Sequence, residues 1–309
     1  MSTPTAPFRG IIPPMITPLL YKNQLDVEGL ERLVEHMLEG GIHGLFILGT
    51  TGEAPSLSYA LRYELVERVC RQVAGRIPVL VGVTDTSLTE SLRLAEIAQK
   101  EGAAAVVSAP PYYYAPSQQE LIEYYEDLAD HMPLPVFLYN MPSHVKVSFE
   151  PATVRTIAQH PNVIGLKDSS GAMVYFHTLI QTIKKENPSF SLLVGPEELT
   201  AEAVLFGADG GVNGGANMFP RLYTDLYEAA VRRDLDAILP LQEKVMYISN
   251  TIYKIGRYGS SYLKGLKCTC SLLGICSDFM ASPYHRFRKE ERDKVKAVLE
   301  SMDIPVVNP

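Results

Sequence analysis

The sequence predicts an α/β protein, a closed (β/α)8 TIM barrel with a small C-terminal helical appendage. Eight short apolar runs recur between residues 10 and 217, amphipathic stretches fill the gaps between them, and only helical patterns follow from about residue 222. Eight strand-then-helix units fit one closed barrel better than two open sheets. We therefore expect residues 1–221 to form the barrel with the active site, and residues 222–309 to form a barrel-closing helix and a C-terminal helical segment.

The eight apolar runs are the predicted strands. Each is nearly continuous in its hydrophobicity, as a parallel strand buried on both faces requires, whereas strict alternation would indicate one solvated face. The last run is rich in glycine and offers little side-chain volume to fill a barrel. The runs lie at residues 10–18, 44–49, 78–84, 104–110, 135–140, 163–170, 191–197 and 209–217.

Start and stop signals mark the predicted helices. Asp26 is placed to cap a helix whose apolar stripe includes Leu30 and Val34 and which ends at Gly40 and Gly41. The sequence SQQE, at 117–120, is a capping box for a later helix. Beyond the barrel, helical patterns cover about residues 222–233, 235–255, 261–275 and 287–301.

Composition and charge narrow the function classes. The chain has 309 residues, 46% of them hydrophobic, with a formal charge of −7 and a pI near 5.6. No basic block stands out, which argues against a nucleic-acid partner, because phosphate binding needs clustered Lys and Arg. The N-terminus lacks the pattern of a signal peptide, and no run reaches the roughly 18 apolar residues of a spanning helix. We expect no membrane partner and a cytoplasmic location.

The cysteines and histidines show no metal-site pattern. Cys268, Cys270 and Cys276 are close in sequence, but their spacing is not that of paired zinc ligands. We expect them to pack as small buried hydrophobes. The seven histidines also lack a paired-ligand spacing. We therefore expect neither a metal nor another cofactor.

Polar residues collect at the carboxyl ends of the predicted strands. In a parallel barrel these ends and their loops converge on one rim, which is where the active sites of such barrels lie. The rim residues include hydroxyls, one amine and backbone donors: Gly49-Thr50-Thr51-Gly52-Glu53, Tyr112-Tyr113-Tyr114, Tyr139, Lys167, Glu197 and Glu198.

Lys167 ends the apolar run of the sixth predicted strand. If its side chain points into the barrel, the alternation along a strand turns Leu166 and Asp168 toward the helices. A buried ammonium without a carboxylate partner is costly, so burial favours the neutral amine. A neutral lysine attacks carbonyl carbons, and the position therefore predicts Schiff-base chemistry. A surface lysine at a strand end is the alternative interpretation.

Schiff-base chemistry also needs a proton shuttle. Tyr139 ends the preceding strand and lies two residues from Phe137, so both side chains share the inward direction. Thr50 is placed to hydrogen-bond the Tyr139 phenol, and the Gly-Thr-Thr-Gly turn exposes backbone N–H groups suited to a carboxylate. Taken singly, a core tyrosine and a tight turn explain these features equally well.

At these residues the sequence resembles the dihydrodipicolinate synthase and N-acetylneuraminate lyase family of pyruvate-dependent class I aldolases. The resemblance runs from PPMITP, at 13–18, through the helical tail, and the motifs GTTGE, PYY, YNMP and GLKDSSG occur in this order on successive strands. It implies that the partners are small molecules, namely pyruvate or another 2-keto acid and an aldehyde. Proteins similar to this one are usually homotetramers, built as dimers of tight dimers.

The resemblance also implies a role for each motif residue. Lys167 is then the Schiff-base lysine for pyruvate, Tyr139 the general acid/base and Thr50 the relay hydroxyl. The remaining implied roles are binding of the pyruvate carboxylate by Thr51, completion of the hydroxyl relay across a subunit interface by Tyr113, and a backbone carbonyl from Val212. Gly49 belongs to the expected substrate-binding residues without a separate role.

Departures from the family pattern bear on the substrate. The synthases carry an arginine after YNxP that binds the carboxylate of aspartate semialdehyde, and here His144 stands at that place. The lyases usually begin the Thr-Thr pair with serine, where this chain has Thr50. Glu197 and Glu198 are similar to the lyases' acidic segment, which suits sugar hydroxyls and opposes an anionic aldehyde. The alternative is that both acids only open the following helix.

We therefore expect a Schiff-base lyase that condenses or cleaves pyruvate and an aldehyde, or dehydrates a 2-keto-3-deoxy sugar acid. The first alternative is dihydrodipicolinate synthesis from pyruvate and aspartate semialdehyde. A phosphate-sugar barrel with GGVNGG as its phosphate site, and a metabolite-binding protein without chemistry, are further alternatives.

Overall fold

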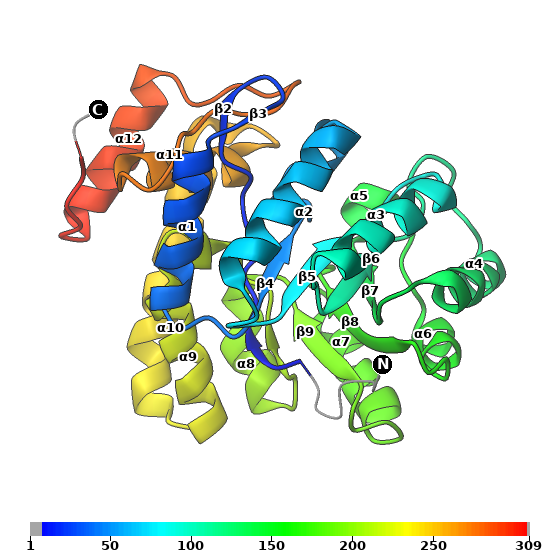
Figure 1. Ribbon diagram of the computed structural model, residues 1–309. Helices are drawn as coiled ribbons and strands as arrows, with labels where there is room; N and C mark the ends of the chain where they lie inside the picture. Colours follow the sequence, from blue (N-terminus) through cyan, green and yellow to red (C-terminus); the bar gives the residue numbers. More distant parts are fainter. Residues whose placement is uncertain (1–7, 308–309) are drawn as a thin grey trace.

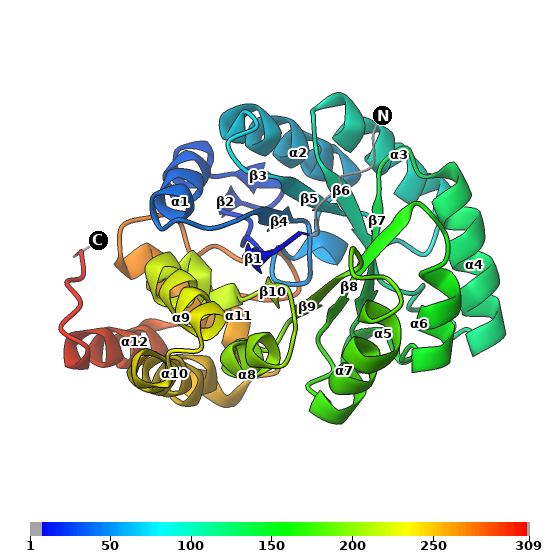
Figure 2. The same ribbon diagram turned by 90° about the horizontal axis from the view of Figure 1, so that it is seen from below.

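Eight parallel strands form a closed ring in the computed structural model, which describes residues 8–307. The sheet order is β1-β10-β9-β8-β7-β6-β5-β4. The segment after β1 closes the ring onto β4, because the Phe46 amide donates to the Pro13 carbonyl (3.0 Å) and the Met15 amide donates to the Phe46 carbonyl (2.8 Å). Figure 2 looks onto this ring, with the helices arranged around it. The predicted TIM barrel is confirmed.

Strands and helices alternate through the barrel, and helices continue after it. The strands are β1 Gly10–Ile11, β2 Leu19–Tyr21, β3 Gln24–Leu25, β4 Leu45–Ile47, β5 Val79–Gly82, β6 Ala105–Ser108, β7 Val136–Asn140, β8 Val163–Asp168, β9 Ser191–Val194 and β10 Gly210–Gly211. The helices of the barrel are α1 Val27–Glu39, η1 Ala54–Ser56, α2 Tyr59–Val73, α3 Leu88–Lys100, α4 Gln118–His131, α5 Pro142–Val145, α6 Pro151–Ile157, α7 Met173–Leu179, η2 Ile180–Lys184, η3 Glu197–Leu199, α8 Thr200–Leu205 and η4 Gly214–Asn217. The later helices are α9 Pro220–Arg232, α10 Leu235–Asn250, η5 Ile252–Arg257, α11 Ser261–Leu272 and α12 Lys289–Ser301.

The first and last strands are much shorter than the apolar runs that predict them. Pro13 and Pro14 follow β1 and lack the backbone N–H that a ladder needs, so the strand ends at Ile11 and a single bridge joins Pro14 to Phe46. β10 ends at Gly211, and the chain turns into η4 at Gly214. The hairpin of β2 and β3 has no counterpart among the predicted strands.

The helix signals of the sequence are confirmed where they were most specific. The Asp26 carboxylate accepts from the Gly29 amide (3.0 Å) and caps α1. Ser117 and Glu120 form the predicted capping box of α4. The stretch expected as one helix over 235–255 is instead divided into α10 and η5, with non-helical backbone at Ile255 and Gly256.

The core has two layers, one inside the ring and one between the ring and the helices. The alternation along β8 follows the prediction, because Leu166 belongs to the outer layer. Tyr139 and Phe137 of β7 both belong to the inner layer, as predicted from their spacing. The inner layer also includes Ile12, Phe46, Leu80, Val107, Leu193 and Val212.

The C-terminal helices extend from the wall of the barrel to its carboxyl end. Tyr223 and Leu226 of α9 pack with Ile11 of β1, and Ile238 and Val245 of α10 join the same cluster. α11 and α12 lie at the same end of the barrel as the β2–β3 hairpin, at the top of Figure 1. The expected division after residue 221 stays a prediction. α9 begins at Pro220, so this boundary falls within its first turn.

Cys268, Cys270 and Cys276 are all buried in the outer core layer. Burial raises the pKa of the Cys268 thiol to about 12. Within residues 8–307, no group of three or more His, Cys, Asp or Glu side chains is arranged to hold a metal ion.

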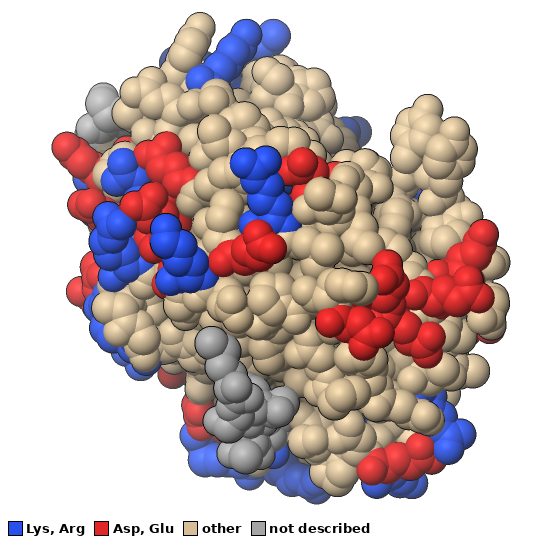
Figure 3. Space-filling view, turned by 45° about the vertical axis from the view of Figure 1, so that its right-hand side comes forward, with Lys and Arg blue, Asp and Glu red and all other residues tan. Residues whose placement is uncertain are grey.

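The described helices lack a membrane-spanning segment, and charged side chains are unevenly distributed over the surface. Every helix between residues 8 and 307 is too short or too polar to cross a lipid bilayer. On the face drawn in Figure 3, basic and acidic side chains are intermixed at the left, acidic ones gather at the right, and uncharged surface lies between them.

Candidate active site

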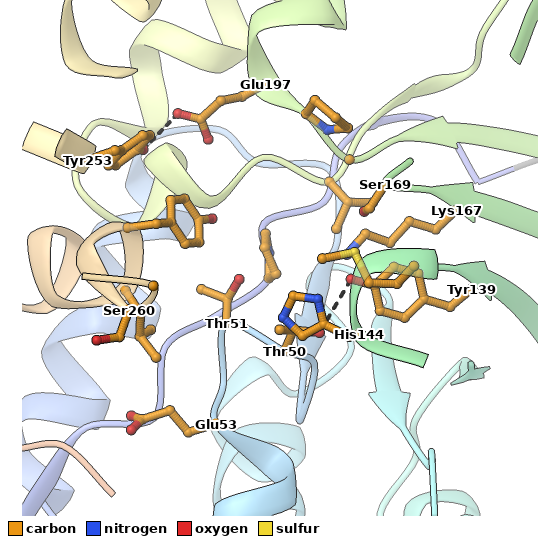
Figure 4. A pocket seen from close by; sticks show the side chains of 18 of the residues that line it. Thr50, Thr51, Glu53, Tyr139, His144, Lys167, Ser169, Glu197, Tyr253 and Ser260 are labelled. Carbon is orange, nitrogen blue, oxygen red and sulfur yellow. Dashed lines mark hydrogen bonds between the residues drawn. The ribbon is translucent and has the colours of Figure 1, made fainter. Parts of the chain in front are cut away.

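A cavity of about 510 Å³ opens at the carboxyl ends of the strands. Its walls come from the loops after β4, β7, β8 and β9 and from the C-terminal segment around residues 253–263. Figure 4 shows Lys167 and Tyr139 on one side of this cavity and Ser260 and Tyr253 on the other. Part of the rim that the sequence predicted therefore lines one cavity, together with side chains that it did not predict; the predicted rim residues in this cavity are Thr50, Thr51, Glu53, Tyr139, Lys167, Glu197 and Glu198.

Lys167 points into the cavity from the end of β8. The residue is only 5% exposed, and its Nζ atom lies 4.1 Å from the centroid of the Tyr139 ring and 5.1 Å from that of the Phe46 ring. Within residues 8–307 the amine forms no ion pair with a carboxylate. Asp168, its neighbour in sequence, is turned away and accepts from the Asn140 amide (2.7 Å). The inward direction of Lys167 is thus as predicted.

Tyr139 stands beside Lys167 because β7 and β8 pair in a register that sets these two residues opposite each other. Its hydroxyl lies 3.4 Å from the Thr50 Oγ1 atom. Burial by itself raises the pKa of the Tyr139 phenol, but the charge of Lys167 and hydrogen bonds with Thr50, Ser169 and Lys167 outweigh it. The pKa of Tyr139 therefore lies below the usual value of a tyrosine, which suits a group that exchanges protons.

The Thr50–Thr51 turn follows β4 and is held by backbone contacts. The Glu53 amide donates to the Thr50 carbonyl (3.0 Å), and the Thr17 hydroxyl donates to the Gly52 carbonyl (2.7 Å). Thr50 and Thr51 both line the cavity with Lys167. Gly49 does not line it; it lines a smaller adjoining cavity of about 200 Å³.

His144 stands on α5 at the boundary of both cavities. Partial burial lowers the pKa of its imidazole, and the charge of Lys167 lowers it further. Both effects favour a neutral ring. His144 is therefore poorly suited to replace an arginine as the binding group for an anion.

Tyr113 does not line the cavity that contains Lys167. It is 73% exposed, and its ring packs edge-on against Tyr114, with 5.1 Å between the centroids. A role for Tyr113 within the same chain is therefore not supported. Its implied role across a subunit interface stays a prediction.

Glu197 lines the cavity, but its carboxylate is occupied by the protein itself. Oε1 accepts from the hydroxyls of Tyr223 (2.6 Å) and Tyr253 (2.7 Å), and Oε2 accepts from the Gly215 amide (2.8 Å). Burial raises the pKa of the Glu197 carboxyl despite these three donors. Three of the roughly four acceptor positions of the Glu197 carboxylate are thus used within the protein, and its binding of sugar hydroxyls stays a prediction.

Glu198 is also engaged, though less completely. Its Oε1 atom accepts from the Ser249 hydroxyl, and its carbonyl accepts from the Gln242 side chain (2.7 Å). Glu198 still lines the cavity and is only partly buried, and its binding of sugar hydroxyls stays a prediction. Val212 follows β10, is 3% exposed and lines the cavity.

The last two glycines of GGVNGG are explained by close packing of phenols, and the first two by close approach of the Gly10 backbone and the Asn213 side chain. A Cβ atom on Gly214 would lie 1.7 Å from the Tyr262 hydroxyl, and one on Gly215 would lie 1.9 Å from the Tyr223 hydroxyl. The Gly215 amide already donates to Glu197. A phosphate at this turn would meet that carboxylate, so the phosphate-sugar interpretation loses its site.

Several cavity residues were missed by the sequence analysis. Ser169 follows Lys167 by two positions at the strand end, and the same rim argument could have identified it. No local signal marks the C-terminal segment, because a helix that follows a barrel carries no pattern saying which end of the barrel it covers. The missed residues of that segment are Tyr253, Gly259, Ser260, Tyr262, Leu263 and Tyr284.

Known proteins resemble the chain over almost its whole length. Residues 7–302 match the model of the dihydrodipicolinate synthetase family. The solved structure of dihydrodipicolinate synthase from Bacteroides thetaiotaomicron is 59% identical, with a TM-score of 0.93 over 97% of this chain and 100% of that one. YagE from Escherichia coli K12, solved in complex with pyruvate, is 29% identical, with a TM-score of 0.90 over 96% of this chain and 99% of that one.

A curated relative carries an aldolase name. It is the probable 2-dehydro-3-deoxy-D-pentonate aldolase YjhH of Escherichia coli K12, which is 32% identical over 96% of this chain and 98% of its own length. Proteins named as synthases and as aldolases are thus both similar to this chain.

Proposed function

The chain belongs to the dihydrodipicolinate synthetase family, and on that premise we propose that it joins pyruvate to, or releases it from, an uncharged hydroxylated aldehyde. It is a class I lyase that works through a Schiff base. Family membership accounts for the imine chemistry. The residues that line the cavity determine which aldehyde is proposed.

We assign imine formation to Lys167. Its amine adds to the keto carbon of the substrate, and the keto oxygen leaves as water with one amine proton and one proton donated by Tyr139, which leaves the protonated imine. In the cleavage direction, the protonated imine accepts the electron pair of the broken C3–C4 bond, and the C4 hydroxyl gives up its proton as the aldehyde departs. Tyr139 is the proposed acceptor of that proton, with Thr50 as the hydroxyl that relays it.

The Thr50–Thr51 turn is the proposed binding site of the keto-acid carboxylate. Both threonines line the cavity with Lys167, and hydroxyl and backbone donors suit a carboxylate. Val212 and Gly49 are proposed to shape this end of the site through their backbones. Within this assignment the carboxylate and the imine are held at the ends of β4 and β8, two strands of the ring that are separated by β5, β6 and β7.

The charges that line the cavity are the observation that carries the substrate proposal. Among the described lining residues, Lys167 is the only Lys or Arg, and the imine would use it. The remaining polar lining is mostly hydroxyls, including Ser169, Ser260 and Tyr262. A second carboxylate on the aldehyde would enter without a cation to pair with it, at a cost that a neutral polyol avoids.

Dihydrodipicolinate synthesis is the second candidate, and the 59% identity to a structure of that name favours it. Aspartate semialdehyde carries a carboxylate that needs a positive partner. His144 stands where the synthases have an arginine, and its lowered pKa keeps it neutral. We therefore rank the sugar-acid lyase first.

A homotetramer completes the proposal. Tyr113 is 73% exposed and outside the cavity of its own chain, so a relay through it requires a second subunit. The measurement is the molar mass of the native protein in solution, combined with the activity of Tyr113→Phe. The cytoplasmic location stays a prediction.

The substrate is tested by comparing the rates of the two candidate reactions, each measured separately. Cleavage of 2-keto-3-deoxy-pentonate and 2-keto-3-deoxy-gluconate is followed by pyruvate release, and condensation of pyruvate with aspartate semialdehyde is followed separately. We expect kcat/KM to be at least about tenfold higher for a sugar acid than for aspartate semialdehyde. This factor corresponds to the one ion pair that the carboxylate of the semialdehyde does not form in the cavity. The matched variant His144→Arg should raise kcat/KM for aspartate semialdehyde. A wild-type preference for the semialdehyde would reverse the ranking.

A further inference from the structure

A fully buried ion pair joins the loop after β4 to helix α11. The Lys267 ammonium donates to Glu53 Oε1, and the two side chains are 0% and 2% exposed. Lys267 also donates to the Phe279 carbonyl (2.7 Å), and the second Glu53 oxygen accepts from the Ala281 amide (2.8 Å). Every charge in this group therefore has partners, although the two residues are 214 positions apart in the sequence.

Each partner of the ion pair belongs to a different wall of the cavity. Glu53 itself lines the cavity and closes the turn that carries Thr50 and Thr51, to which its amide is bound (3.0 Å). On the other side, the beginning of α11 supplies Ser260 and Tyr262. In the view of Figure 4, Thr51 lies between Ser260 and Lys167, and Glu53 lies below Ser260 and Thr51. The Lys267 ammonium thus joins α11 to the loop that contains the turn.

Stability alone does not explain this ion pair. Burying two charges costs several kcal/mol each by general estimates, and replacing such a pair by neutral groups of similar volume is often neutral or stabilising. What neutral groups do not reproduce is a fixed geometry between two distant segments. Glu53 also adopts a left-handed backbone, with φ of 58°, which a non-glycine residue holds only when its surroundings require it.

We propose that Lys267 is a positioning residue that sets the spacing between the Thr50–Thr51 turn and the α11 wall. Through that spacing it determines how tightly the keto acid is bound and which aldehydes fit. This inference rests on the proposed function, because it assumes that these two walls hold the substrate. Lys267 touches neither the substrate nor the reacting atoms.

The decisive variant is Glu53→Gln with Lys267→Met, which removes both charges and leaves no unpaired ion. We expect a midpoint of thermal unfolding close to wild type, imine trapping that still modifies Lys167, and a KM for the keto acid raised about tenfold or more. The ratio of kcat/KM between short and long sugar acids should also change. A double variant with wild-type KM and wild-type selectivity would overturn the proposal.

Lys184 and Asp209 provide the matched control. They form a comparable ion pair, 19% and 4% exposed, that is not part of the cavity lining. Lys184→Met with Asp209→Asn should alter stability and leave KM and selectivity unchanged. If this control changes KM by as much as the first pair does, general loosening of the barrel explains the effect and the proposal fails.

A second variant keeps the test informative if the double variant does not fold. Glu53→Asp preserves both charges but shortens one side chain, so either the turn or α11 must move to keep the contact. We expect KM to rise several-fold while the midpoint of unfolding changes little, and an unchanged KM would count against the proposal. Failure of the proposed function is a different result, because the wild-type protein would then prefer aspartate semialdehyde to the sugar acids, whatever the effect of the variants at Glu53 and Lys267.

Discussion

Tyr139 and Lys167 occupy opposite positions on β7 and β8, and the Lys167 Nζ atom lies 4.1 Å from the centroid of the Tyr139 ring. Parallel pairing makes this proximity a property of the sheet rather than of a loop. A nucleophile and a proton carrier are thereby held on rigid neighbouring strands, which is the placement that precise chemistry needs.

Loss of the Tyr139 hydroxyl should slow the reaction without disturbing the fold. Tyr139→Phe keeps the ring beside Lys167 and the inner core layer. General acid–base catalysis contributes about 10²- to 10⁴-fold, so we expect kcat to fall within that range. The measurement is steady-state kinetics on the best sugar acid. A kcat within about threefold of wild type would remove Tyr139 from the mechanism.

The Thr50 hydroxyl should shift the pH dependence of the reaction. Contact with Thr50 helps to lower the pKa of Tyr139, so Thr50→Val raises that pKa. Imine formation needs the protonated phenol, because Tyr139 donates a proton to the departing water, and this step is lost as the pH rises through the phenol pKa. We therefore expect the alkaline limb of kcat against pH to move to higher pH in the variant, together with a lower maximum. An alkaline limb at the same pH in both proteins would contradict this.

Much of the fold followed from the sequence because parallel strands leave a strong local signal. Runs buried on both faces identified the strands, and their shared direction brought Lys167, Tyr139 and Thr50 to one rim. The direction of Glu197 was not predictable in the same way. It depends on Tyr223 and Tyr253, which come from helices far along the chain.

The contribution of the C-terminal segment could not be read from the sequence. The contact between Glu53 and Lys267 joins positions 214 residues apart, and neither residue stands out in its local pattern. Proline explains why β1 is shorter than the apolar run that predicts it. Pro13 and Pro14 belong to that run but cannot donate hydrogen bonds to a strand ladder.

The buried carboxyl of Glu197 should make stability depend on pH. Burial raises its folded-state pKa above the ordinary value of 4.5, so the folded chain holds this proton more tightly than the unfolded chain. The free energy of unfolding therefore falls as the pH rises from about 4.5 through the raised pKa. In Glu197→Gln this slope should be smaller, as urea unfolding at a series of pH values would measure. Equal slopes in both proteins would mean that Glu197 carries no such proton.

A methyl group at Gly214 should disturb the cavity wall. Its Cβ atom would lie 1.7 Å from the Tyr262 hydroxyl, so Tyr262 must move. We expect Gly214→Ala to lower the free energy of unfolding by about 1–3 kcal/mol and to raise KM for the sugar acid. Tyr262→Phe in the same protein should relieve part of the strain, because the clashing oxygen is gone. No rescue by that second substitution would show that the strain lies elsewhere.

The central claim is that the Lys167 amine forms an imine with a 2-keto acid, and reduction by borohydride in the presence of pyruvate tests it most directly. Peptide mass mapping should find the reduced pyruvate adduct on the peptide that contains Lys167, with activity lost in proportion, and Lys167→Met should take up none. An adduct on other lysines only, or turnover of sugar acids by Lys167→Met at the wild-type rate, would contradict the account.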